Sequence, residues 1–228
     1  MKTWQERITV MAVSKMYRDK LVLSGINDQG KWVRISSLSH YDLEDDQNLI
    51  LKLFGRSELT CWSLGRTEED GFVYEPTRLE DCLMLREPKP KLLNEIKGED
   101  KQTLVKSYID GGVDEAFKRE RTLGIIKPLV EEVYFGWNAL DNIFESTFVF
   151  RDKSGQRYKF VCTDLKWHYS CIFLFQRKPN QIYKELNELP EKLNKKDTYF
   201  VIGLTKPFME VPGAFKGSWP LILGIHSF

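Results

Sequence analysis

The fold is decided by one stretch of the second half of the chain, which runs Thr147-Phe-Val-Phe-Arg-Asp-Lys-Ser-Gly-Gln-Arg-Tyr-Lys-Phe-Val-Cys-Thr-Asp164. Asp152 opens and Gly155 closes a four-residue segment with the residue preferences of a type I turn, whose last position tolerates positive φ. Both flanking arms alternate in character, as side chains of a strand do with a period of two. The stretch therefore predicts an antiparallel hairpin.

The alternation also predicts which side chains of this hairpin are buried. Phe148 and Phe150 share one face of the first arm. On the second arm Phe160 lies on the matching face, while Arg157 and Lys159 point the other way. The hairpin thus combines an apolar inner face with a basic outer face.

A second hairpin with the same features is expected near the N-terminus. Asn27–Gly30 has Asn first and Gly last, and it leads into the strand-like run Lys31–Ile35. When the two hairpins are aligned on their closing glycines, Trp32 and Arg34 take the positions of Arg157 and Lys159. The repeat suggests two related domains.

The composition is that of a globular protein without a strong charge. Of 228 residues, 42% are hydrophobic and 29% are charged, and 34 basic against 33 acidic residues leave a net charge of +1. This length can bury two small cores. The charge balance excludes a protein that is basic all over, so any nucleic-acid site must be a local patch.

No targeting or membrane segment is expected. The chain has no apolar run near the roughly 18 residues of a membrane span, and Met1–Arg7 lacks the apolar core of a signal peptide. The prediction is a cytoplasmic protein without a membrane partner.

The cysteines are predicted to be reduced and buried. They are few and widely spread, namely Cys61, Cys82, Cys162 and Cys171. A metal cluster of Cys162, His168 and Cys171 lacks a fourth ligand and the usual spacing of two residues between cysteines. No metal and no cofactor is predicted.

Changes in composition divide the chain into three parts. Short apolar runs separated by Gly and Pro predict a β-rich domain over residues 1–86. Two prolines in Glu87–Lys91 begin a region in which Leu92, Leu93 and Ile96 have helical spacing, so residues 87–121 are expected to form a helical connector. Residues 122–228 form the second β-rich domain.

The order of elements in the second domain is typical of an OB barrel. Three strands are expected first, then a helix that starts at Pro179 and is bounded by Pro190, and then two strands. An OB-fold is a five-stranded barrel, and its helix commonly joins the third and fourth strands. The predicted fold class is mostly β with some α, with two OB-like five-stranded barrels joined by a short helical connector.

Four phrases of the sequence resemble the dual OB-containing domain family of prokaryotic proteins. They are Gly30–Arg34, Leu123–Pro128, Gly155–Asp164 and Gly203–Phe208. The resemblance covers nearly the whole chain. The family is named for its fold and has no established activity, so the resemblance implies two OB-like barrels and, by analogy with other OB-folds, nucleic-acid binding.

OB-folds typically bind oligonucleotides on the face of strands two and three, where aromatic rings stack on bases and basic groups hold phosphates. The predicted nucleic-acid-binding residues are accordingly Trp32, Arg34, Arg157, Lys159 and Lys206. The first four are expected on exposed faces of the barrels. In the alternative interpretation, Trp32 covers the interface between the halves and Arg34 stacks on it.

A second candidate site is a functional loop after the central hairpin, made of Asp164, Lys166, Trp167 and His168. Asp164 and His168 have the chemistry of an acid–base pair. However, no nucleophile elbow, phosphate-binding Gly loop or His-Glu-x-x-His helix accompanies them. A structural role is the simpler account, with Asp164 capping a turn.

Three functions remain open at this point. The first is a non-enzymatic module that binds single-stranded nucleic acid. The second is a protein-interaction or structural adaptor without nucleic-acid binding, which the near-neutral charge favours. An enzyme that uses Asp164 and His168 comes third, because its usual motifs are absent.

Overall fold

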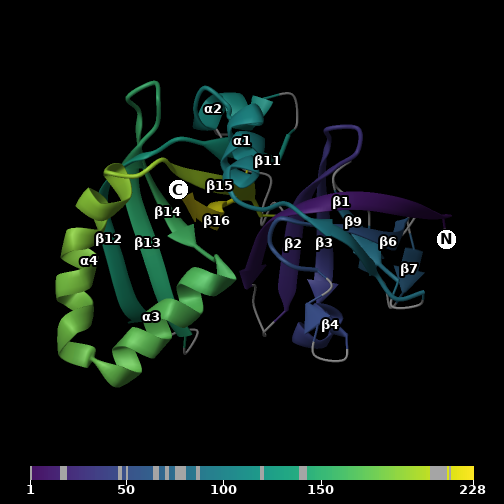
Figure 1. Cartoon of the computed structure of the whole chain (residues 1–228), viewed down its shortest axis with the longest axis horizontal. Helices are drawn as coiled ribbons and strands as arrows, with labels where there is room; N and C mark the ends of the chain where they lie inside the picture. The colour runs from purple at the N-terminus through teal and green to yellow at the C-terminus, as the bar shows by residue number, and fades with distance from the viewer. Residues whose placement is uncertain are drawn as a thin grey trace. The chain divides into compact units, whose positions relative to one another are not determined.

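A computed structural model describes residues 2–15, 20–45, 48–49, 51–63, 67–69, 72–74, 81–85, 88–118, 121–138, 143–205, 215 and 217–228. The chain divides into two compact units, Met1–Thr103 and Leu104–Phe228. Figure 1 shows both units, which are described in turn below.

The first unit contains a closed five-stranded barrel. Its strands follow the order β1-β2-β3-β9-β6 and return to β1, and β3 and β9 are parallel while the other pairs are antiparallel. The bounds are β1 (Lys2–Lys15), β2 (Leu21–Asn27), β3 (Trp32–Leu38), β6 (Gly55–Ser63) and β9 (Asp81–Met84). A parallel pair between the third and fifth strands with this order is the Greek-key arrangement of an OB barrel.

The long first strand closes this barrel by pairing on both of its edges. Residues 2–9 of β1 pair with β6, and residues 8–15 pair with β2. Ile8 and Thr9 have partners on both sides. A strand continuous through these two residues therefore joins the two ends of the sheet.

The rest of the first unit consists of short elements. They are the 3₁₀ turn η2 (His40–Asp42), the strand pair β4 (Glu44–Asp45) and β5 (Asn48–Leu49), the pair β7 (Thr67–Glu69) and β8 (Phe72–Tyr74), and β10 (Lys91–Glu95). β10 pairs antiparallel with β6. The helix predicted here from the spacing of Leu92, Leu93 and Ile96 was wrong. Pairing with a neighbouring strand outweighs a weak local period.

The second unit repeats the strand order of the first. Its six-stranded sheet runs β11-β15-β16-β14-β13-β12, with β14 and β16 parallel. The bounds are β11 (Leu123–Ile126), β12 (Leu129–Asn138), β13 (Ile143–Arg151), β14 (Arg157–Cys162), β15 (Thr198–Leu204) and β16 (Pro220–Ser227). If β11 and β12 are counted as one interrupted first strand, the order and the parallel pair are those of the first unit.

The predicted fold class is confirmed, but the second sheet is not closed. β11 pairs with β15, and β12 pairs with β13. Between them Pro128 has no amide N–H to donate, and it interrupts the ladder. The closed second barrel expected from the sequence is therefore replaced by an open sheet with the same strand order.

Four helices complete the fold of the described chain. α1 (Glu99–Ser107) and α2 (Val113–Ala116) precede the second sheet, and α3 (Leu165–Arg177) and α4 (Pro179–Asn194) lie between β14 and β15. The helix predicted to begin at Pro179 is confirmed, but it continues through Pro190 to Asn194, where burial of Leu193 supports its last turn. α4 lies alongside β12 (Figure 1).

Aromatic rings in contact with one another form part of the core of the second unit. Phe148 and Phe150 from β13 both meet Phe200 from β15 edge to face, with ring centroids 5.4 Å apart. Ile182, Leu186 and Leu193 of α4 belong to the same core. Edge-to-face pairs add to the hydrophobic gain from burying such large rings.

The central hairpin has the predicted turn and register. The amide of Gly155 donates to the carbonyl of Asp152 over 3.0 Å, and Gly155 has φ +85°. Phe150 lies opposite Tyr158. The turn at Asn27–Gly30 is closed by an equivalent bond of 2.9 Å, which confirms the similarity of the two hairpins.

The side chain of Asp152 ties this turn to α2. Its Oδ1 accepts hydrogen bonds from the amide and hydroxyl of Ser154, and its Oδ2 accepts from the amide of Val113 over 2.9 Å. Burial opposes ionisation of Asp152, but the hydrogen bonds from Ser154, Val113 and Gln156 outweigh it and lower the pKa of the carboxyl group. The ionised carboxylate is therefore the form that holds the turn.

We expect Asp152→Ala to lower the free energy of unfolding by about 1–3 kcal/mol at pH 7, because buried donors lose their acceptor. A lowered folded-state pKa contributes stability above the unfolded-state pKa of about 3.9, and the contribution is lost as the pH falls through the folded-state value. Urea denaturation at neutral and strongly acidic pH measures the change. A gap between wild type and variant that does not shrink in acid contradicts this account.

Candidate functional site

The outer face of β12, β13 and β14 in the second unit is the surface on which basic and aromatic side chains meet. The register places Arg151 opposite Arg157 across β13 and β14. It places Val149 between Glu132 on one side and Lys159 on the other. The side chains of these three strands that point away from the core therefore include Arg151, Arg157, Glu132 and Lys159, with Val149 between the last two.

Ion pairs organise the basic residues of this face. Arg157 donates from Nε to Glu131 over 2.7 Å and from Nη2 to Glu132 over 2.8 Å, and Arg151 donates from Nε to Glu131 over 2.7 Å. The hydrogen bond from Arg157, followed by that from Arg151, lowers the pKa of Glu131, and the bond to Glu131 raises the pKa of Arg157. Both shifts favour the charged forms of Glu131 and Arg157.

Tyr134 is the aromatic residue of the face. It is 50% exposed, and the ammonium of Lys159 lies 5.7 Å from its ring centroid, within cation–π range. Its hydroxyl donates to Glu132, a contact that raises the pKa of the phenol. Sequence analysis missed this tyrosine, although its alternation with buried Val133 and Phe135 is the signal that would have placed it outward.

The predicted nucleic-acid-binding residues differ in their exposure to solvent. Arg157 and Lys159 are exposed, as expected. Trp32 is only 9% exposed and Arg34 only 7%, so the expectation that both lie on an open face was wrong. Lys206 lies outside the described residues.

The burial of Trp32 and Arg34 is part of a wider pattern in the first unit. β2 is buried from Leu21 to Ile26, and β3 is buried from Trp32 to Ile35. The alternation along β2 and β3 predicted which side chains point inward and which point outward, but the side chains of both sets are buried. The surface of strands two and three, where an OB barrel typically holds its ligand, is thus not exposed in this unit.

The predicted functional loop is instead the first turn of α3. Asp164 is the N-cap residue: its Oδ1 accepts from the amide of Trp167 over 2.7 Å, and its Oδ2 accepts from the amide of Ile225 over 2.9 Å. Burial raises the pKa of this carboxyl group, against the effect of the two hydrogen bonds. Asp164 therefore has a structural task of the kind that capping residues perform.

The residues that follow Asp164 in the sequence lie on different sides of α3. Trp167 packs against Phe148 with ring centroids 5.5 Å apart, and its indole N–H is buried without a hydrogen-bond partner. His168 meets the ring of Tyr169 edge to face at 5.9 Å, and Lys166 is exposed. Sequence analysis missed α3 because apolar residues occur on all its sides, which hides the helical period.

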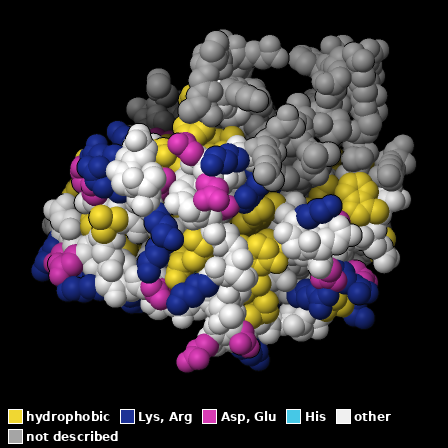
Figure 2. All heavy atoms as spheres, turned by 90° about the horizontal axis from the view of Figure 1, so that it is seen from above, with side chains coloured by type: hydrophobic (Ala, Val, Ile, Leu, Met, Phe, Trp, Pro, Cys, Tyr) yellow, Lys and Arg dark blue, Asp and Glu magenta, His cyan; other side chains and the backbone are white. Residues whose placement is uncertain are grey.

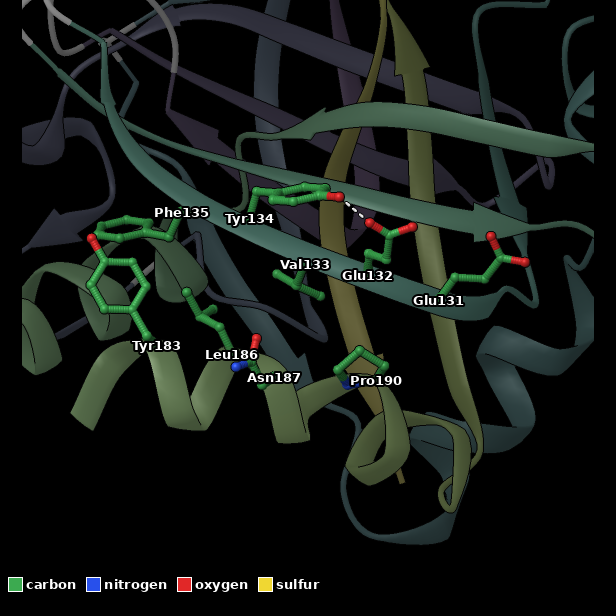
Figure 3. A pocket seen from close by; sticks show the side chains of 9 residues that line it. All are labelled: Glu131, Glu132, Val133, Tyr134, Phe135, Tyr183, Leu186, Asn187 and Pro190. Carbon is green, nitrogen blue, oxygen red and sulfur yellow. Dashed lines mark hydrogen bonds between the residues drawn. The ribbon is translucent and has the colours of Figure 1, made fainter. Parts of the chain in front are cut away.

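A groove runs between β12 and α4 beside the charged face (Figure 3). It has a volume of about 240 Å³ and is lined by Glu131, Glu132, Val133, Tyr134 and Phe135 from the strand and by Tyr183, Leu186, Asn187 and Pro190 from the helix. Val133 and Leu186 point toward one another, and Tyr183 lies next to Phe135. The helix contributes one stripe, at positions i, i+3, i+4 and i+7.

The charged side chains of the molecule are mixed in sign. Figure 2 shows Lys and Arg next to Asp and Glu on the face that it draws, with apolar side chains between them. Among the residues that the structure describes, no group of three His, Cys, Asp or Glu side chains is placed to hold a metal ion. In the same part of the chain, no helix is long and apolar enough to cross a membrane.

Both units thus have the strand order of an OB-fold, which defines the class of the protein. No family model matches the sequence, and no curated protein matches it. The fold is similar to a chain in the structure of a replication protein A heterotrimer bound to ssDNA, with 9% identity and a TM-score of 0.36. That match covers 98% of this chain and 49% of the other, so this chain spans about half its length.

We expect Trp32→Ala to lower the free energy of unfolding by about 3–5 kcal/mol, because a large aromatic side chain leaves a buried site. Tyr41 is a matched control in the same unit, since it is 90% exposed, and Tyr41→Ala should leave stability nearly unchanged. Chemical denaturation of the three proteins measures both changes. Equal effects of the two substitutions would show that Trp32 is not packed as described.

Proposed function

We propose that the chain is a non-enzymatic binding module that holds single-stranded nucleic acid on the outer face of β12, β13 and β14. One observation carries the proposal: this surface of the first three OB-type strands is exposed in the second unit and carries Arg151, Arg157, Lys159 and Tyr134. The corresponding surface of β2 and β3 in the first unit is buried. The site is therefore assigned to the second unit.

The chemistry of the face suits a single strand. A guanidinium group has five N–H donors, and Arg157 uses one on Nε and one on Nη2 for its glutamates, which leaves donors for a phosphate. Tyr134 offers a half-exposed ring on which a base can stack, with Lys159 beside it. The two glutamates offset much of the positive charge, so we expect modest affinity and strong dependence on salt.

We expect the full chain to bind a mixed-sequence single-stranded oligonucleotide at low salt and to bind a duplex of the same length more weakly. Tyr134→Ala should weaken binding by about 1–3 kcal/mol, because a stacking platform is lost. Arg157→Ala should reduce the slope of log K against log salt by about 0.7, the value for one phosphate contact on a single strand. Fluorescence anisotropy titrations at several salt concentrations measure both effects.

Arg7 provides the control for Arg157. It is also an exposed arginine that pairs with a glutamate, since its Nε donates to Glu58 over 2.6 Å, but it belongs to the first unit. Arg7→Ala should leave the affinity and the salt slope unchanged. No binding at low salt, or equal losses in both arginine variants, would remove the basis for this function.

A further inference from the structure

Two thiols meet inside the barrel of the first unit. All four cysteines of the chain are buried thiols. Cys61 lies on β6 and is fully buried, and Cys82 lies on β9 and is 6% exposed. The thiol of Cys82 donates to Sγ of Cys61 over 3.2 Å. A disulfide joins its sulfur atoms at about 2 Å, so a shift of roughly 1 Å brings this pair to bonding distance.

The strand pairing places both cysteines on the same face of the sheet. β6 and β9 are antiparallel, and Cys61 lies opposite Met84. Cys82 precedes Met84 by two residues, and residues two apart along a strand share a face. The two cysteines are thus diagonal neighbours on adjacent strands, a relation in which side chains still reach one another. Their contact therefore follows from the register of the barrel.

The strand that carries Cys82 is held by short ladders. β9 has four residues, and it pairs with β6 at two positions and with β3 at three. One further hydrogen bond to β6 runs from the amide of Leu85 to the carbonyl of Thr60 over 2.8 Å. Strands with few backbone hydrogen bonds open locally more often than the rest of a sheet. Local opening of β9 therefore gives a small molecule access to Cys82.

β9 is also the strand that completes this barrel. In the order β1-β2-β3-β9-β6 it lies between β3 and β6, and β6 in turn pairs with β1. Separation of β9 from β6 leaves a gap in this ring of strands. A covalent bond between Cys61 and Cys82 would prevent that separation.

We propose that Cys61 and Cys82 are a reversible redox pair, which forms a disulfide when it reacts with a small-molecule disulfide such as oxidised glutathione. The thiolate of Cys82, the more exposed of the two, attacks one sulfur of the small disulfide and displaces one small thiolate. The thiolate of Cys61 then attacks Sγ of Cys82 and displaces the second. The protons of both cysteines pass to the two small thiols, and the two electrons that the cysteines lose reduce the small disulfide. This inference does not depend on nucleic-acid binding.

The other two cysteines provide a control within the same chain. Cys162 belongs to β14 and Cys171 to α3, and both are in the core of the second unit. Burial raises the pKa of the Cys162 thiol, and it raises the pKa of Cys171 to about 11. Because the thiolate is the attacking form, both should react slowly. We expect them to stay reduced under conditions that oxidise Cys61 and Cys82.

The test exposes the full native chain to oxidised glutathione and then alkylates the remaining thiols. Mass spectrometry of the intact protein should show the loss of two hydrogen atoms, with two cysteines alkylated instead of four. Peptide mapping should find the bond between Cys61 and Cys82. An excess of reduced glutathione should restore all four thiols.

Matched variants assign the bond, and hydrogen exchange measures its effect. Cys82→Ser should abolish the bond, whereas Cys171→Ser should retain it, and circular dichroism checks that both variants are folded. In wild type, exchange of the Leu85 amide should slow after oxidation, because this amide donates across the ladder that the bond fixes. Cys82→Ser should show no such change.

Several outcomes overturn the inference. They are four alkylated cysteines after exposure of the native chain, glutathione retained on a single cysteine, or a bond between any other two cysteines. A bond that forms only in urea also contradicts it, because such a bond comes from the unfolded chain. Unchanged exchange at Leu85 would show that the bond does not hold β9 in place. Peptide mapping of the wild type decides the question even if Cys82→Ser does not fold.

Discussion

The break at Pro128 is the constraint on which the second unit depends. In the first unit β1 is continuous, and Ile8 and Thr9 pair with strands on both sides, so the barrel closes. In the second unit the same path is divided into β11 and β12, because proline cannot supply the amide that continued pairing needs. The sheet stays open, β12 pairs with β13 alone among the described strands, and α4 lies along it.

This edge places two surfaces of different character next to one another. The outer face carries Arg151, Arg157 and Lys159, and the groove contains Glu131 and Glu132 without a basic residue. The glutamates belong to both surfaces, since they hold the arginines on one side and line the groove on the other. The nucleic-acid site proposed on the outer face and the groove therefore share these two glutamates.

Sequence alone predicted the parts of this structure that local rules govern. Turn residues and alternation gave both hairpins, and they placed Arg157 and Lys159 outward. Tertiary effects account for the errors. Alternation separates the two faces of a strand but does not say whether the outer face is covered, which is why Trp32 and Arg34 were expected to be exposed. α3 is apolar on all sides, and the groove depends on elements some 50 residues apart, so no local pattern indicated either one.

Amide hydrogen exchange along β12 tests most directly whether this edge is free. Val130 exchanges hydrogen bonds with Asn194, so its pair with Phe150 is a non-hydrogen-bonded one. Because pair types alternate along β13, we infer that Val133 and Phe135 direct their amides away from β13, whereas Glu132 and Tyr134 direct theirs toward it. Exchange rates report the opening of individual backbone hydrogen bonds. The account predicts fast exchange at the first two positions and slow exchange at the other two, in strict alternation. Uniformly slow exchange along the strand would mean that the edge is already paired, and it would contradict the account.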